Sequence, residues 1–147
     1  MCQPVIIVER EGQVLELVDA PFVDEDDLQR VLADRPEILA GRQPSGSSPL
    51  RFALIAREEG VPDSRYGWDR WSVDHVFVDE QAVPTLVEVK RSGDTRIRCE
   101  VVGQLLDYAA NAVVHWPAGR MRESFEATCR ERAVDADREL ERLLSGS

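Results

Sequence analysis

The stretch SVDHVFVDEQAVPTLVEVK, residues 72–90, decides the fold. It holds two apolar, strand-like runs, 72–79 and 83–90, and Pro84 suits the first residues of a strand. The few residues between the runs predict a hairpin that turns about Gln81. In that register, opposed residues on the two strands have numbers that sum to 162.

The hairpin register makes Asp74 and Glu88 direct cross-strand partners. Side chains alternate between faces along a strand, and opposed Cβ atoms lie roughly 5 Å apart, so the two carboxylates are expected together on one face. Two carboxylates at that distance repel each other, and a bound divalent cation removes the penalty. Hard oxygen ligands predict Mg²⁺ or Mn²⁺ at this place.

Lys90 follows two residues after Glu88 and is therefore predicted on the same face. Its ammonium group is suited to position an attacking water or to help deprotonate it, and to neutralise charge that develops on a phosphate. Asp74, Glu88 and Lys90 together predict a metal-dependent phosphodiesterase centre.

Patterns outside this hairpin predict the remaining elements. Two strand-like runs within the first 24 residues predict a hairpin. Asp24 is then predicted to cap a helix that ends or kinks at Pro36. Further predictions are a loop over 41–49, a strand over 50–56, a loop over 60–68, a helix over 97–112, a short last strand over 113–116, and two helices within 120–144 that break near 134–137. This order predicts an α/β fold, with a mixed sheet and helices packed over it.

The helix predicted over 97–112 carries two polar side chains on its inward stripe. Gln104 lies about one turn before Tyr108, and both share a side with Ile97 and Val101. A buried amide and a buried phenol need hydrogen-bonding partners, which a metal site, its water or a substrate phosphate provides. Interface packing explains Gln104 as well, and core packing explains Tyr108 equally well.

These residues resemble the PD-(D/E)XK nucleases, in the RecB- and NucS-like branch with a QxxxY motif. The matching positions are Asp74, then Leu86-Val87-Glu88-Val89-Lys90-Arg91, then Gln104-Leu105-Leu106-Asp107-Tyr108. The likeness covers about residues 24–114, and Ser72-Val73-Asp74 lacks the proline of the motif's name, as is common in the family.

The resemblance implies a restriction-endonuclease-like fold and a set of residue roles. The whole chain is expected as one domain, with an αβββαβ core over about 24–116 and C-terminal helices over about 118–144. The family cleaves phosphodiester bonds with Mg²⁺ or Mn²⁺ and leaves a 5′-phosphate. The implied metal ligands are Asp74, Glu88 and the Val89 carbonyl, the implied catalytic residues also include Lys90 and Gln104, and a further acid on the first helix is Glu37 or Glu25, with Glu37 preferred.

Charge and composition narrow the expected partners. The net charge of −10 argues against a protein that coats nucleic acid, but Lys90, Arg91, Arg96 and Arg98 give a local basic patch for phosphates. A solvated loop explains the three arginines almost as well, and the resemblance implies Tyr108 as a further DNA contact. No apolar run is long enough for a membrane span, and three widely spaced cysteines favour a reducing cytoplasm. The expected substrate is DNA, with RNA left open, and a homodimer or a partner domain is a further possibility.

Simpler explanations remain beside these hypotheses. Asp74 and Glu88 also suit a solvated sheet face, and Lys90 a surface ion pair. His75 is predicted to be structural because it points away from the Asp74 face, and Trp68, Trp71, His115 and Trp116 are better explained by packing than by base stacking. The alternative function is a catalytically silent nucleic-acid-binding or regulatory interaction domain with the nuclease fold.

Overall fold

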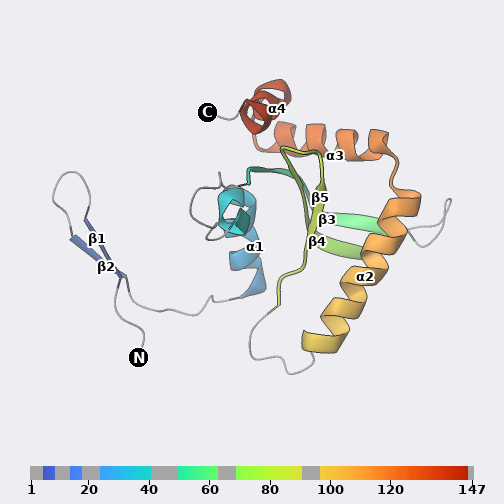
Figure 1. The fold of residues 1–147 in the computed structure, drawn as a ribbon, viewed down its shortest axis with the longest axis horizontal. Coiled ribbons are helices and arrows are strands. Elements are labelled where there is room, and N and C mark those ends of the chain that lie inside the picture. Colours follow the sequence, from blue (N-terminus) through green and yellow to red (C-terminus); the bar gives the residue numbers. More distant parts are fainter. Residues whose placement is uncertain are drawn as a thin grey trace.

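The computed structural model describes residues 5–8, 14–17, 24–40, 50–62, 69–90 and 97–145. Its strands form two separate antiparallel sheets (Figure 1). The N-terminal pair is β1 (Val5–Val8) with β2 (Val14–Leu17), which confirms the predicted first hairpin. The larger sheet has the order β3-β4-β5, built from β3 (Phe52–Pro62), β4 (Asp69–Asp79) and β5 (Pro84–Val87).

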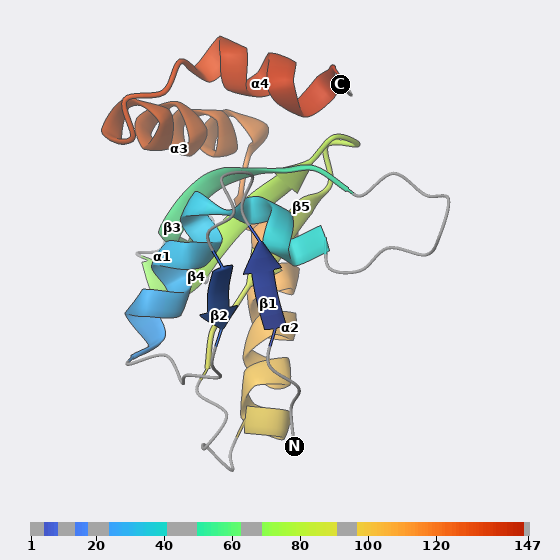
Figure 2. The same ribbon diagram turned by 90° about the vertical axis from the view of Figure 1, so that its left-hand side faces the viewer.

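Helices cover both faces of the three-stranded sheet. The helices are α1 (Glu25–Asp34), the 3₁₀ helix η1 (Pro36–Ala40), α2 (Ile97–His115), α3 (Ala118–Glu131) and α4 (Ala136–Leu144). Figure 1 shows the sheet between α1 and α2, and Figure 2 shows α3 and α4 together across one end of it. The mixed α/β fold class is therefore confirmed.

Two apolar clusters hold these layers together. On the α1 side, Leu32 and Ala33 pack with Phe77 and Val89. On the other side, Val76 packs with Tyr108 of α2 and with side chains of α3 and α4. Each fully buried side chain of this size contributes about 1.5–3 kcal/mol through its removal from water, so the clusters fix where α1 and α2 lie on the sheet.

The hairpin register follows the sequence prediction. The pairs His75 with Val87 and Val76 with Leu86 confirm that opposed residues sum to 162. The turn explains this register, because Oδ1 of Asp79 accepts hydrogen bonds from the backbone N–H groups of Gln81 (2.9 Å) and Val83 (2.8 Å). An aspartate that closes its own turn in this way leaves no freedom for a one-residue slip.

Three sequence predictions about the elements are wrong. The predicted strand over 113–116 is helix through His115, where the α2 ladder continues until the Trp116 N–H donates to the Ala112 carbonyl (2.9 Å). The β-branched Val113 and Val114 favour a strand only weakly, and an intact hydrogen-bond ladder outweighs that preference. Without that strand, the described sheet is entirely antiparallel, not mixed. The strand predicted over 50–56 also runs further, through residues expected in a loop, to Pro62.

The first strand of the larger sheet has its outer edge covered by side chains of the C-terminal half. The Thr128 hydroxyl donates to the Ile55 carbonyl (2.7 Å). The Gly60 carbonyl accepts from Trp116 Nε1 (3.1 Å) and from the Arg120 guanidinium (2.9 Å). These bonds satisfy carbonyls that an edge strand otherwise offers to another chain, so the packing of α3 protects the β3 edge.

Candidate functional site

Glu88 is the most buried charged group of the predicted centre. Its side chain is only 3% exposed, and Oε1 forms an ion pair with Lys90 Nζ at 2.8 Å. Its second oxygen, Oε2, is buried and has no hydrogen-bond partner among the described residues. A buried carboxylate oxygen without a donor is costly, so Oε2 is a polar atom whose partner is to be explained.

Asp74 lies beside Glu88 and fastens the end of β5. The strand predicted to reach Lys90 ends at Val87, so the paired residues stop at His75 with Val87, and Asp74 and Glu88 each follow directly beyond that last pair. Oδ2 of Asp74 accepts a hydrogen bond from the Val89 N–H at 2.7 Å. The Val89 side chain is buried on the α1 side. Asp74 therefore holds the backbone on which Glu88 and Lys90 stand, and this bond uses Oδ2 alone.

Lys90 is a protonated partner in this cluster. Burial works to lower the pKa of Lys90, but the hydrogen bond and charge of Glu88, with the charges of Asp74 and Glu25, raise that pKa above its ordinary value. The side chain is 30% exposed, so its ammonium group reaches both Glu88 and solvent. In neutral solution Lys90 is a cationic hydrogen-bond donor, which suits the orientation of a water or the neutralisation of a phosphate.

Of the two candidate acids near the first helix, Glu25 is one of the charges that raise the pKa of Lys90. Asp24 caps α1 by accepting from the Asp27 N–H (2.8 Å), and Glu25 at the start of the helix acts on the charge of Lys90. Glu37 lies in η1 at the other end, where it pairs with Arg35 at 3.8 Å and lines a cavity of about 230 Å³ beside Cys129. The sequence named both acids and preferred Glu37, because the docking of α1 on the sheet is not specified by local pattern.

The QxxxY pair lies on the sheet side of α2. Tyr108 is buried in the core cluster with Val76, and the Gln104 amide donates to the Tyr108 hydroxyl oxygen. Leu86 of β5 packs against the same cluster. Gln104 and Tyr108 therefore lie over the face of the sheet that carries the Leu86 side chain, two residues before Glu88. The inward orientation predicted for both residues is therefore confirmed, and their catalytic or DNA-contacting roles stay predictions.

Most of the arginines predicted to contact phosphates lie outside the described residues. Arg91 and Arg96 lie outside the described residues, and Arg98 lies within α2 with its side chain outside them. Trp68 is also outside, as is the Trp71 side chain. Trp116 is partly buried against the core cluster, as predicted.

His75 has a structural role, as its predicted orientation indicated. It is fully buried, stacks on Phe77 at a centroid distance of 5.5 Å, and its Nε2 lies 2.8 Å from the Gln29 carbonyl of α1. Burial lowers the pKa of His75, against the weaker opposing effect of that carbonyl. A neutral imidazole with Nε2–H donating to Gln29 therefore joins β4 to α1.

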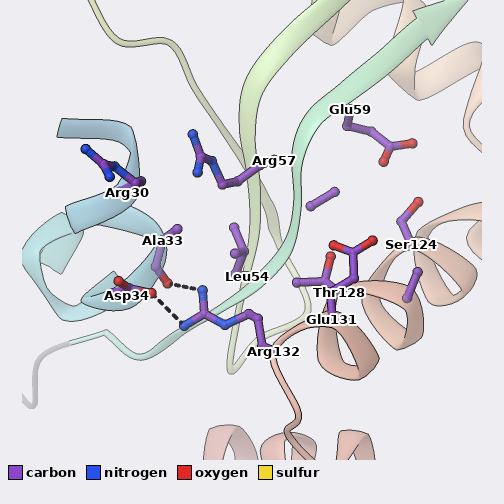
Figure 3. A pocket seen from close by; sticks show the side chains of 12 residues that line it. Arg30, Ala33, Asp34, Leu54, Arg57, Glu59, Ser124, Thr128, Glu131 and Arg132 are labelled. Atoms are coloured by element: carbon purple, nitrogen blue, oxygen red, sulfur yellow. Dashed lines mark hydrogen bonds and ion pairs between the residues drawn. The ribbon is translucent and has the colours of Figure 1, made fainter. Parts of the chain in front are cut away.

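A separate cavity lies away from the carboxylate cluster. Its volume is about 480 Å³, and α1, β3 and α3 form its walls (Figure 3). Three arginines line it, but Arg132 already bridges to Asp34 at 3.2 Å and Arg57 to Asp26 at 2.7 Å. Neither Asp74, Glu88 nor Lys90 belongs to its lining. The carboxylate cluster therefore lies apart from this cavity, where the end of β5 meets the middle of β4.

Comparisons with known proteins add no further constraint on this site. No family model, curated protein or solved structure matches the chain.

Proposed function

We propose that the chain is a metal-dependent nuclease that hydrolyses DNA phosphodiester bonds with Mg²⁺ or Mn²⁺. The observation that carries the proposal is the Glu88 carboxylate, which is buried, paired through Oε1 with Lys90, and without a hydrogen-bond partner at Oε2 among the described residues. A structural ion pair in a core satisfies both oxygens of its carboxylate. A centre that binds a ligand leaves one of them free.

The donor set suits a hard divalent cation. Among the described residues, no three Asp, Glu, His or Cys side chains converge to hold an ion by themselves. Mg²⁺ rarely needs such a cage, because it keeps several waters and binds through one or two carboxylates together with substrate phosphate oxygens. Asp74 and Glu88 supply that minimal set, with the Val89 carbonyl as the main-chain ligand and Glu25 as a nearby acid.

Each residue of the cluster has a distinct role in the proposal. When bound, the metal ion lowers the pKa of a water and screens the scissile phosphate. Asp74 holds the strand end through its bond to the Val89 N–H, which keeps Glu88 in place. Lys90 orients the attacking water and stabilises negative charge on the phosphate. Gln104 and Tyr108 support the sheet side of the centre from α2.

The overall charge supports a second candidate, a nuclease fold that binds or regulates without cleavage. The net charge of −10 opposes the approach of DNA everywhere except at a local basic surface. Arg91, Arg96 and Arg98 are proposed to form that surface. If they do not, the domain needs a partner to meet DNA.

Cleavage of a panel of single-stranded, duplex, flapped and mismatched DNA with Mn²⁺ or Mg²⁺ tests the proposal. Wild-type activity that requires metal and vanishes in Glu88→Gln and Lys90→Ala is the expected result. Glu126→Gln, on the surface of α3 and paired with Arg122, is the matched control and keeps its activity.

Two further outcomes have defined meanings. Activity that persists in both site variants refutes the assigned centre. No cleavage of any substrate, with Mn²⁺ binding intact by calorimetry, favours the silent module. Calorimetry of Glu25→Gln and of Glu37→Gln then shows which acid contributes to metal binding. Only Glu25→Gln is expected to weaken Mn²⁺ binding.

A further inference from the structure

Helix α2 carries an apolar stripe that faces solvent. Val102, Leu106, Val113 and Val114 are 55%, 66%, 86% and 72% exposed. The first three fall within roughly 40° of one another around the helix axis, so they form one line rather than a scatter. Single exposed apolar residues are ordinary, but a contiguous line of them marks an interaction surface.

The core does not need these side chains. The inward side of α2 is already filled by Tyr108 and Ala112, which are buried. Within the described residues, Figure 1 shows no helix or strand beyond α2 on its outer side, and the β1–β2 hairpin lies across the sheet from it. The stripe is therefore a surface that the described part of one chain leaves open.

Small residues alternate with the large ones along this surface. Gly103 and Ala110 are exposed on the same side, and a Cβ added at Gly103 would meet no atom within 4 Å. We define the α2 outer stripe as Val102, Gly103, Leu106, Ala110, Val113 and Val114. Gaps beside large side chains are the pattern by which two helices interlock at close range.

We propose that the α2 outer stripe binds the same stripe of a second copy, with the two helices antiparallel and the two-fold axis at the level of Tyr108. In that arrangement Leu106 faces Ala110 of the second copy, and Gly103 faces Val113. These two levels each set a large side chain against a small one, the third level sets Val102 against Val114, and every pair occurs twice by symmetry. The proposal does not depend on nuclease activity.

Charge argues against nucleic acid and anionic lipid as occupants, and the length of the stripe fits one helix of a second copy. The stripe is bordered by the exposed acids Glu100 and Asp107, which repel nucleic acid and anionic lipid. From Val102 to Val114 it runs about 18 Å at 1.5 Å per residue. That length matches one helix but gives less area than a standard interface of about 1,600 Å², so the dimer is weak and depends on concentration.

Sedimentation of the full chain from about 5 μM to about 500 μM tests the proposal, because a weak dimer dissociates in this range. The wild type is expected to rise from the mass of one chain toward that of two. Leu106→Arg and Ala110→Glu are each expected to stay monomeric, and an equimolar mixture of the two to regain dimer, since Leu106 and Ala110 face each other. Leu144→Arg, at the similarly exposed Leu144 (64%), is the control and dimerises as wild type.

Circular dichroism of each variant separates loss of dimer from loss of fold. A folded wild type that stays monomeric at the highest concentration overturns the proposal. A dimer that survives both substitutions overturns it as well, because the contact then lies elsewhere. If each single variant is monomeric and their equimolar mixture also stays monomeric, the antiparallel register is overturned.

Discussion

Replacing Lys90 with methionine isolates the energy of the Glu88 pair. Methionine keeps most of the length of the side chain but removes its charge and its donors. The Glu88 side chain is 3% exposed, so its carboxylate would be left buried with neither oxygen paired. Breaking a fully buried pair in this way costs about 3–5 kcal/mol. Lys90 is 30% exposed and water enters in its place, which reduces the expected loss to about 2–3 kcal/mol.

Urea unfolding at neutral pH with a chelator present measures this loss. The expected result is a lower midpoint with an unchanged slope, because the compactness of the folded and unfolded states stays the same. The double variant Glu88→Gln with Lys90→Met is the control. It removes the buried charge and is expected to recover at least about 1 kcal/mol relative to Lys90→Met alone. A loss below about 0.5 kcal/mol, the value of a solvated surface pair, would refute the reasoning.

Four further predictions follow from single contacts. Lys90 is the only lysine of the chain, so ¹³C-lysine labelling gives one ε-carbon signal. Titration of that signal is expected to show a pKa above the ordinary value for lysine, and the pKa is expected to fall back in Glu88→Gln. A wild-type midpoint at the ordinary value counts against the Glu88–Lys90 pair. The pKa of buried His75 is lowered, so the unfolded chain binds more protons than the folded chain and the free energy of unfolding falls as pH drops below about 6.5. In urea titrations between pH 7 and about 5.5, His75→Gln is expected to show a smaller fall than the wild type. Thr128→Val leaves the Ile55 carbonyl without its donor and is expected to cost about 1–2 kcal/mol, whereas a cost near zero means that water replaces the hydroxyl. Lys90→Arg is expected to keep stability within about 1 kcal/mol yet to weaken Mn²⁺ binding by about tenfold or more, as measured by calorimetry; unchanged affinity contradicts the open-oxygen argument.

Local rules were sufficient to predict the hairpin that carries the site. The turn at Asp79–Val83 closes through its own side-chain bonds, so the register of β4 and β5 depends on few distant residues. Because the alternation of faces follows from that register, the neighbourhood of Asp74 and Glu88 was predictable too. The cap of α1 at Asp24 is local in the same sense.

Features that depend on tertiary packing were not predictable in this way. The choice between Glu25 and Glu37 depends on how α1 docks through Leu32, Ala33 and Phe77, which no local pattern specifies. The continuation of α2 through Val113 is a competition between β-propensity and an established helix, and a short apolar run gives no sign of the winner. The open oxygen of Glu88 required the burial of its side chain to be known.

The identity of residue 90 connects these features to function. Every other basic residue of the chain is arginine, so the composition gives no general preference for lysine at this position. An arginine beside Glu88 could engage both carboxylate oxygens with its planar fork, as arginine–carboxylate pairs commonly do. Lysine is a point donor, and here it reaches Oε1 alone at 2.8 Å while Oε2 stays open. A purely structural pair gains by closing both oxygens, whereas a metal centre requires one to be free. In the proposed centre, the single lysine therefore stands at the position where the difference between the two cations decides whether Glu88 keeps an oxygen for the metal ion.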